Sequence, residues 1–117
     1  MLRELLKSKI HGATITDARL DYEGSLTVDE ELLEAADILP NERINVWNIT
    51  NGERLFTYAI PAMRGSGTIC LNGAAAKKGS KGDLVVITAF ALVSEEEAKT
   101  LKPKIIHVDV KNSIRKS

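Results

Sequence analysis

Short apolar runs separated by turn-forming residues are the feature that most restricts the fold of this chain. Residues 42–49 alternate between polar and apolar side chains around Ile44 and Val46, the period of a strand with one buried face. The dipeptide Asn51-Gly52 follows and favours a tight hairpin, because both residues tolerate positive φ. A returning strand is then expected over 55–60. This pattern predicts a mainly β domain.

Three further strands are expected, over 68–71, 84–93 and 105–110. The middle one is almost continuously apolar, which is typical of a central strand that is buried on both faces. Gly65-Ser66-Gly67 indicates a turn just before the first of them. The sheet is therefore expected to contain strands from most of the chain.

Two short helices are expected between these strands. The first covers 29–36, with Asp29 as its N-terminal cap. The second begins at Ser94, where Ser94-Glu95-Glu96-Glu97 forms a capping-box pattern, and ends before Pro103. At the N-terminus Leu2, Leu5, Leu6 and Ile10 fall at helical spacing, so periodicity alone predicts a helix over 2–10. A strand over the same residues is the alternative.

Composition limits the classes of protein to which the chain can belong. Its 117 residues fit one domain, 1–117, and 44% of them are hydrophobic. Sixteen basic residues balance sixteen acidic ones, so no nucleic-acid partner is expected. The charged N-terminus does not resemble a signal peptide or a membrane span. Together with the single cysteine, these features predict a soluble, cytoplasmic protein without a membrane partner.

Two local features are given structural interpretations. Cys70 lies between Ile69 and Leu71, which predicts a buried thiol within a strand. The basic segment at about 111–117 is expected to be a flexible, solvated tail.

Few residues in this chain suggest conventional catalysis. There is no phosphate-binding glycine loop, and the two histidines are far apart in the sequence. A Gly-Ser bond, however, can cleave itself and convert its serine into a reactive carbonyl group. Three such bonds occur, at Gly24-Ser25, Gly65-Ser66 and Gly79-Ser80, and composition alone does not choose among them.

A set of motifs makes that choice. They occur in order and in register between Lys9 and about Val93, and they are Tyr22-Glu23-Gly24-Ser25, Trp47-Asn48, Thr50-Asn51-Gly52 with Arg54, Thr57-Tyr58-Ala59-Ile60, Arg64-Gly65-Ser66-Gly67 and Asn72-Gly73-Ala74-Ala75-Ala76. This pattern resembles the aspartate 1-decarboxylases, the pyruvoyl-dependent enzymes of pantothenate synthesis. The resemblance implies a double-psi β-barrel with short peripheral helices, and a homotetramer with active sites between subunits. It also favours a strand at the N-terminus.

The resemblance further implies self-cleavage between Gly24 and Ser25. The Ser25 hydroxyl attacks the Gly24 carbonyl, where glycine tolerates a strained backbone, and Thr57 is the expected donor to the oxyanion. Elimination and hydrolysis then leave fragments 1–24 and 25–117, the larger one beginning with a pyruvoyl group. This covalent group would be the cofactor, with no metal and no pyridoxal phosphate.

The expected reaction is decarboxylation of L-aspartate to β-alanine and carbon dioxide. The pyruvoyl ketone would form a Schiff base with the substrate amine and accept electrons as carbon dioxide leaves. Arg54 is expected to bind the remaining carboxylate through its planar fork. Tyr58 resembles the family's proton donor, and a phenol is mostly protonated at neutral pH.

Other positions match the family's site less specifically. They are Asn72, Gly73, Ala74 and Ala75 as a substrate-binding turn, Lys9 and His11 as lining residues, and Trp47 and Tyr22 as supporting residues. A core position remains the alternative for Trp47, and His107 is interpreted as structural. Alternatives for the whole chain are decarboxylation of another small acidic amino acid, or a non-enzymatic β-barrel that binds or regulates. A maturation factor is a further partner to consider.

Overall fold

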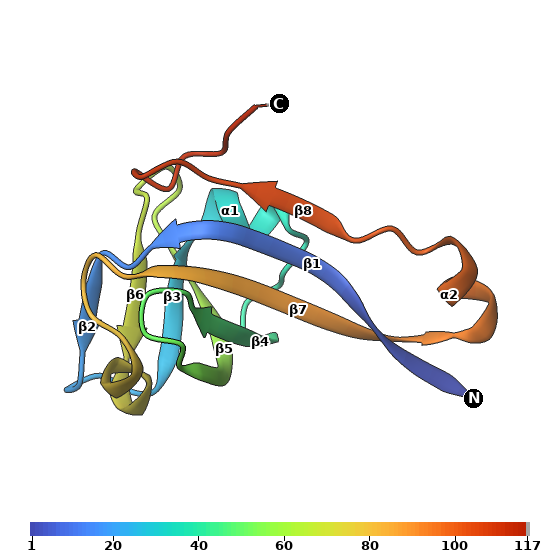
Figure 1. Ribbon diagram of the computed structural model, residues 1–117, viewed down its shortest axis with the longest axis horizontal. Helices are drawn as coiled ribbons and strands as arrows, with labels where there is room; N and C mark the ends of the chain where they lie inside the picture. Colours follow the sequence, from blue (N-terminus) through green and yellow to red (C-terminus); the bar gives the residue numbers. More distant parts are fainter. Residues whose placement is uncertain (117) are drawn as a thin grey trace.

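The computed structural model describes residues 1–116, and within them one eight-stranded mixed sheet runs in the order β2-β6-β3-β5-β4-β7-β1-β8 (Figure 1). The strands are β1 (Leu2–Thr14), β2 (Asp17–Arg19), β3 (Ser25–Asp29), β4 (Arg43–Asn48), β5 (Arg54–Ala62), β6 (Ile69–Asn72), β7 (Leu84–Ser94) and β8 (Lys104–His107). The helices are α1 (Glu30–Ala35), the 3₁₀ helix η1 (Gly73–Lys78) and α2 (Glu95–Thr100).

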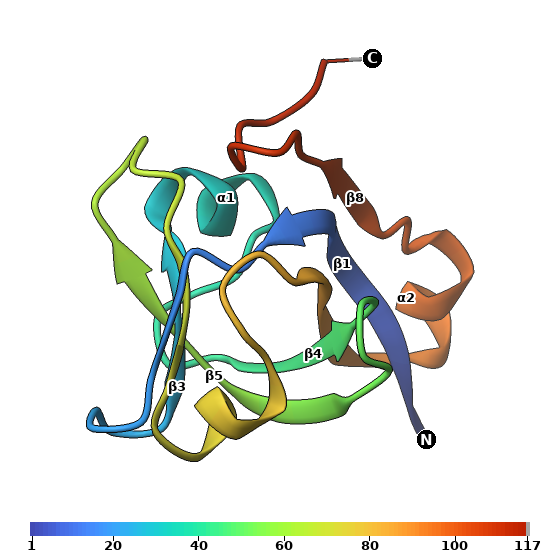
Figure 2. The ribbon, with the colours of Figure 1, turned by 60° about the vertical axis from the view of Figure 1, so that its left-hand side comes forward.

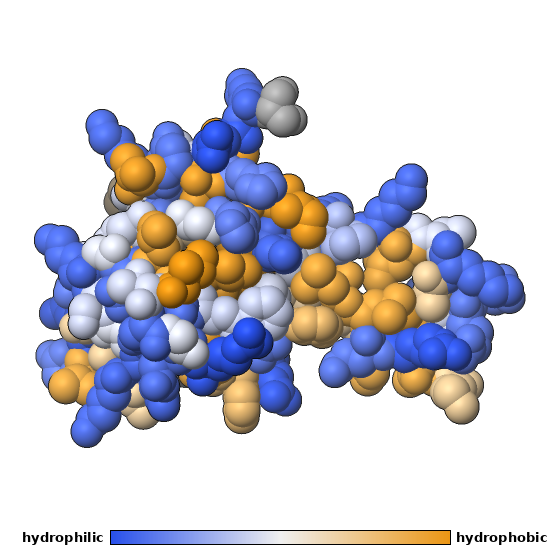
Figure 3. Space-filling view, viewed as in Figure 1, coloured by the Kyte–Doolittle hydropathy of each residue, from blue (hydrophilic) through white to orange (hydrophobic). Residues whose placement is uncertain are grey.

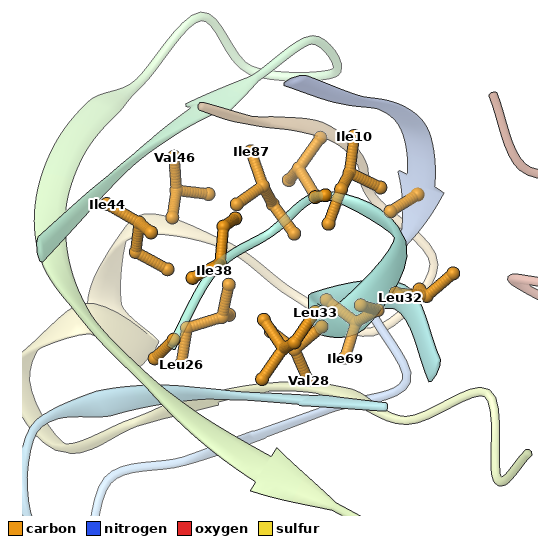
Figure 4. Packing of buried hydrophobic residues seen from close by; sticks show 14 of the residues in the cluster. Ile10, Leu26, Val28, Leu32, Leu33, Ile38, Ile44, Val46, Ile69 and Ile87 are labelled. Carbon is orange, nitrogen blue, oxygen red and sulfur yellow. The ribbon is translucent and has the colours of Figure 1, made fainter. Parts of the chain in front are cut away.

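The sheet curls around a closed apolar centre (Figure 2). Parallel pairs join β3 to β5, β1 to β8 and β2 to β6, and the other neighbours are antiparallel. The inward side chains pack against one another and against α1 (Figure 4), and the labelled ones are Ile10, Leu26, Val28, Leu32, Leu33, Ile38, Ile44, Val46, Ile69 and Ile87. Burial of such side chains is the main stabilising contribution to a fold of this size. The expected double-psi β-barrel is confirmed.

The N-terminal segment is a strand, so the helix predicted from periodicity over 2–10 is wrong. Strand β1 pairs with β7 along its length and with β8 on its other edge. Its register shifts between Leu6 and Ser8 and again between His11 and Ala13. Each such irregularity changes which face the following side chains occupy, so the apolar residues do not alternate strictly. Backbone pairing with β7 and β8, and not the spacing of the apolar side chains, therefore decides the conformation of this segment.

The hairpin between β4 and β5 also differs from the prediction. The loop between the two strands spans 49–53, and within it Gly52 has a positive φ of 80°. The Asn48 side chain accepts hydrogen bonds from the backbone N–H groups of Thr50 and Asn51, at 2.9 and 3.1 Å. These side-chain bonds stabilise a longer loop than the two-residue turn that Asn-Gly usually forms.

Most of the other predicted elements are confirmed. Asp29 caps α1, and Ser94 and Glu97 form both bonds of the capping box on α2. The last strand is shorter than expected and ends at His107. No helix within residues 1–116 combines the length and apolar character needed to cross a bilayer.

Beyond β8 the chain folds back on the barrel. Asn112 is 2% exposed, accepts a hydrogen bond from the Thr14 backbone N–H at 2.7 Å and donates to the carbonyls of Thr14 and Gly67. The expected flexible tail from about 111 therefore includes an anchored residue. Ser117 lies outside the described residues.

One end of the molecule forms an extended arm. It contains the start of β1, the end of β7 and helix α2, and it reaches away from the barrel (Figure 1). Apolar side chains gather on its surface (Figure 3). Leu2 and Leu92, for example, are 63% and 66% exposed. This arm supplies apolar surface outside the core.

Candidate active site

The Gly24-Ser25 bond lies exactly where an exposed loop becomes a buried strand. Strand β3 starts at Ser25, which is 4% exposed, whereas Gly24 is exposed. Gly24 lines a hollow of about 290 Å³ together with Thr57 of β5 and Ala74 and Ala75 of η1. The structure therefore brings the expected cleavage site together with the expected oxyanion donor and the expected substrate turn.

The Ser25 hydroxyl is held by a buried amide. Ser25 pairs with Asn72 across the antiparallel β3–β6 ladder, and Asn72 Nδ2 donates to Ser25 Oγ at 3.0 Å. The carbonyl of Glu23 lies 3.4 Å from the same hydroxyl oxygen, within reach of its proton. A hydroxyl with a directed donor and a directed acceptor has few orientations, which suits an atom that must attack a neighbouring carbonyl.

Gly73 closes the other side of the cleavage segment. Its φ is 65°, and a Cβ placed on it would lie 2.6 Å from the backbone nitrogen of Gly24 and 2.8 Å from the carbonyl oxygen of Tyr22. Only glycine permits this approach together with this backbone conformation. The Asn-Gly sequence at 72–73 therefore begins η1 against the cleavage loop, and it does not form a hairpin turn.

Helix η1 is held in place by the β4–β5 loop. The side chains of Asn48 and Asn51 both donate to the carbonyl oxygen of Lys78, at 3.2 and 3.0 Å. The Lys78 ammonium group, in turn, lies 2.6 Å from a carboxylate oxygen of Glu53. This pairing gives Lys78 a structural role within the basic stretch 77–81, and it fixes one wall of the hollow beside Gly24.

Strand β5 presents its two faces to different surroundings. Thr57 lies on the face that points toward Gly24, next to buried Ile44 of β4. Tyr58 lies on the opposite face and is 36% exposed. Ala59 pairs with Leu26 in parallel register. Tyr58 and Ser25, which come one residue before them, therefore lie side by side on the same face of the sheet. Both expected catalytic side chains therefore lie beside the cleavage site.

Arg54 and Trp47 form a separate hollow of about 220 Å³. They face each other across β4 and β5, and the Arg54 guanidinium carbon lies 4.9 Å from the centre of the indole ring. Trp47 is half-buried and lies outside the core cluster, so its alternative position in the core is excluded. This hollow shares no lining residue with the one beside Gly24.

Lys9 and His11 lie on β1, and β5, β4 and β7 separate that strand from β3. The registers place His11 opposite Val86, which is itself opposite Trp47, so these side chains share the outer face of the sheet. His11 also contacts His107 edge-on, with 5.5 Å between the ring centres. Within one chain His11 therefore lies in the same cross-strand row as Trp47 and Arg54, and β1 is not a neighbour of β3.

The remaining candidates lie farther from the reacting bond. Tyr22 is 49% exposed, with the Arg19 guanidinium carbon 4.1 Å from its ring centre. Gly65-Ser66 is a turn whose Gly65 N–H donates to Asp29. Ser80 begins a turn in which its backbone N–H donates to the carboxylate of Asp83. Neither of these Gly-Ser bonds is adjacent to a buried strand start.

Sequence reasoning missed two further partners of Asn72, the half-buried Thr27 and the buried Cys70. Its Nδ2 also donates to Thr27 Oγ1 at 2.7 Å, and its Oδ1 accepts from Cys70 Sγ at 3.3 Å. The spacings Ser25-x-Thr27 and Cys70-x-Asn72 carried the signal, because residues two apart in a strand share a face. The pairing of the two strands is what unites them, and it was not visible in the sequence.

Comparison with known proteins agrees with this geometry. The family model for aspartate decarboxylase matches residues 1–115. The aspartate 1-decarboxylase of Syntrophus aciditrophicus is 56% identical, with 98% of this chain and 99% of that protein covered. The enzyme of the same name from Caldicellulosiruptor saccharolyticus is 60% identical, with coverages of 99% and 91%. With its cleavage motif, its barrel and matches that span almost its full length, this chain belongs to the aspartate decarboxylase family.

Proposed function

We propose that this protein cleaves itself between Gly24 and Ser25 and then decarboxylates L-aspartate to β-alanine and carbon dioxide. The observation that carries the proposal is the Ser25 hydroxyl, which is buried at a strand start and held by Asn72 directly after an exposed glycine. Residues 1–24 and 25–117 would be the two products. The family to which the chain belongs supports the same reaction.

The surroundings of Ser25 fit a pyruvoyl group. Asn72 already directs an N–H toward the position of Oγ, and the hollow beside Gly24 leaves space for a small substrate. When present, this group supplies a ketone that condenses with an amine and withdraws electrons as carbon dioxide leaves. Forming it would use the serine and one water molecule, with release of ammonia, and needs no metal or pyridoxal phosphate.

Each side chain around the site has a distinct proposed role. The Thr57 hydroxyl stabilises the oxyanion that develops on the Gly24 carbonyl during self-cleavage. The Arg54 guanidinium binds the carboxylate that the substrate keeps, and its contact with Trp47 fixes the plane of the fork. Tyr58 donates a proton to the carbon from which carbon dioxide has left. The turn at Gly73, Ala74 and Ala75 holds the substrate by backbone N–H groups, because its small side chains leave them accessible.

The split between two hollows supports a site built from two subunits. Arg54 and Trp47 line one hollow on the outer face of the sheet and Gly24 lines another, while Lys9 and His11 lie on β1, with three strands between it and the strand of Ser25. A homotetramer that apposes this face to the Gly24 hollow of a neighbour would complete the pocket. The exposed side chain of Phe56, 67% exposed beside the Gly24 hollow, supplies apolar surface for such a contact.

An intact mass spectrum of the purified protein tests this proposal. Two fragments divided after Gly24 are expected, the larger lighter by one ammonia than a peptide that begins with serine. The variant Ser25→Ala is expected to remain uncut and inactive toward aspartate, because alanine has no hydroxyl. Ser66→Ala and Ser80→Ala remove the serines of the other two Gly-Ser bonds and should leave cleavage unchanged. Substantial aspartate decarboxylation by uncut Ser25→Ala would contradict the mechanism.

A further inference from the structure

Four polar or sulfur-containing side chains share one face of the β3–β6 pair. In the antiparallel register Ser25 lies opposite Asn72, and Thr27 lies opposite Cys70. Leu26, between the two β3 residues, is fully buried in the core on the other face. Ser25, Asn72 and Cys70 are 4%, 3% and 7% exposed and Thr27 is half-buried, so the Asn72 amide at the centre of this group is removed from water. Hydrogen bonds among them are therefore expected to be well defined.

The Asn72 amide is fully paired within this group. One Nδ2 hydrogen bond goes to Ser25 Oγ at 3.0 Å and the other to Thr27 Oγ1 at 2.7 Å. Cys70 Sγ lies 3.3 Å from Asn72 Oδ1 and 3.9 Å from the carbonyl oxygen of Leu71, so the nearer amide oxygen is the better acceptor for the thiol proton. Two donors and one acceptor of the amide each have a partner.

The opposite orientation of the amide would be less favourable. Turned by 180°, the amide would direct both N–H groups toward Cys70, whose sulfur is a weak acceptor. One N–H would then be buried without a good partner, which is costly in a water-excluded site. The weakly accepting sulfur of Cys70 thus favours the orientation in which an N–H faces Ser25, and the Thr27 hydroxyl accepts the second N–H in that orientation.

We propose that Cys70 and Thr27 are positioning residues that direct the Asn72 N–H at the oxygen of Ser25, a role that rests on the self-cleavage proposed above. They act through the amide and do not touch the bond that is cleaved. Burial raises the pKa of the Cys70 thiol above its ordinary value, so the sulfur keeps the proton that this role requires.

The directed N–H of Asn72 is expected to accelerate mainly the second step of self-cleavage. In the first step Oγ bonds to the Gly24 carbonyl carbon, the bond from that carbon to the Ser25 nitrogen breaks, and the hydroxyl proton passes to the nitrogen. In the second, the Ser25 α-carbon gives its proton to a water molecule, the electron pair of that C–H bond forms the Cα=Cβ double bond, and the Cβ–Oγ bond breaks. The electron pair of that bond goes to Oγ, which becomes part of a Gly24 carboxylate and leaves dehydroalanine at residue 25. A donor already directed at Oγ stabilises this developing charge.

Paired substitutions at the two positions test the inference. Cys70→Ala and Thr27→Val remove the thiol donor and the hydroxyl acceptor with little change in size, and Cys70→Ser and Thr27→Ser restore a hydroxyl. After cell-free synthesis, intact mass measured over time gives the rate of cleavage. We expect roughly tenfold slower cleavage in the first pair, because a small displacement of the donor weakens its effect. The serine variants should recover most of the rate.

A second readout separates positioning from general loss of stability. If elimination is the slowed step, the ester from the first step accumulates, although its mass equals that of the uncut chain. Hydroxylamine cleaves such an ester and leaves a hydroxamate on Gly24, which mass spectrometry distinguishes from a carboxylate. Cys70→Ala and Thr27→Val should therefore show more hydroxylamine-sensitive full-length chain than the wild type.

Ile69→Val is the matched control, because it removes one methylene from the core face of the same strand and leaves the Asn72 amide alone. It should lower thermal stability without accumulating ester. The positioning roles would be overturned if Cys70→Ala and Thr27→Val cleaved at the wild-type rate. They would also be overturned if cleavage were slow but no ester accumulated and the serine variants gave no rescue. Either result would leave the proposed function intact. A wild-type chain that stays uncut would instead overturn the proposed function, and this inference with it.

Discussion

Gly73 lies against the loop that carries the cleavage site, and its lack of a side chain is what permits the contact. A Cβ at this position would lie 2.6 Å from the Gly24 nitrogen and 2.7 Å from the Gly24 α-carbon, with φ at 65°. We therefore expect Gly73→Ala to displace Gly24 and abolish or strongly slow self-cleavage. Intact mass over time measures the effect, and thermal unfolding reports the accompanying loss of stability.

Gly52→Ala is the matched control for that substitution. Its φ is 80°, but a Cβ there would meet no atom within 4 Å. It should therefore show backbone strain alone, about 1–2 kcal/mol of stability, with cleavage at the wild-type rate. Equal cleavage by the alanine variants at positions 73 and 52 would mean that contact with Gly24 does not matter.

At the residue scale, motif spacing indicated the identities of the candidate site residues but not their contacts. Ser25, Thr57 and Asn72 were all expected, and the structure brings them to the same end of the barrel. The partners Thr27 and Cys70 were missed, because an unremarkable threonine and a strand cysteine gain meaning only when two distant strands pair. Hydrogen bonds between residues 45 positions apart are not encoded in local pattern.

At the scale of elements, Asp29 joins helix α1 to the turn before β6. Its carboxylate caps the helix through the Glu31 N–H at 2.9 Å and accepts the N–H groups of Gly65 and Gly67 at 3.0 and 2.9 Å. Burial by itself would raise the pKa of Asp29, but these backbone bonds and nearby Arg64 lower it below its ordinary value of 3.8. One buried carboxylate thus holds two elements together.

Asp29→Asn should destabilise the fold by about 2 kcal/mol at neutral pH, since an amide has one acceptor oxygen where the carboxylate has two. A carboxyl group whose pKa is lowered by folding contributes stability above its unfolded pKa, and that contribution is lost as pH falls through the folded value. The difference in stability between wild type and variant should therefore be constant near neutrality and shrink below about pH 3.8. Urea unfolding at several pH values measures it.

Ser94→Ala removes the cap of α2, far from this carboxylate, and provides the comparison. It should cost about 1 kcal/mol and show no such dependence on Asp29 titration. A difference for Asp29→Asn that grows toward acid pH would contradict the assigned direction of the pKa. Both caps were predicted from sequence, because a cap depends on residues within one turn of chain.

At the scale of the whole molecule, the proposed pocket needs two subunits, and mixing inactive variants tests this. In the proposed mechanism Ser25→Ala lacks the serine that becomes the reactive carbonyl, and Arg54→Ala lacks the group that binds the substrate carboxylate. If the two groups come from neighbouring subunits, tetramers reassembled from a mixture should regain activity at roughly a quarter of their sites by random pairing. Aspartate decarboxylation after joint refolding measures this recovery.

Each variant refolded alone is the control and should stay inactive. Native mass spectrometry can verify that mixed tetramers have formed. If decarboxylation does not recover in such mixtures, Ser25 and Arg54 act within one chain. The structure makes the first outcome the expected one, because the hollows that contain Gly24 and Arg54 have separate linings.

The sequence by itself determined the strands from 42 to 94 and both helix caps, and it indicated the Gly24-Ser25 bond as the proposed cleavage site, because these depend on side-chain period, local hydrogen bonds and motif spacing. Tertiary structure decided that residues 2–14 form a strand, since backbone bonds to β7 and β8 outweigh helical spacing in the side chains. It also decided that Asn72 meets Ser25, and that His11 lies in the same cross-strand row as Trp47 and Arg54. These outcomes depend on which strands become neighbours, and that choice follows from burial of the core as a whole rather than from any local segment.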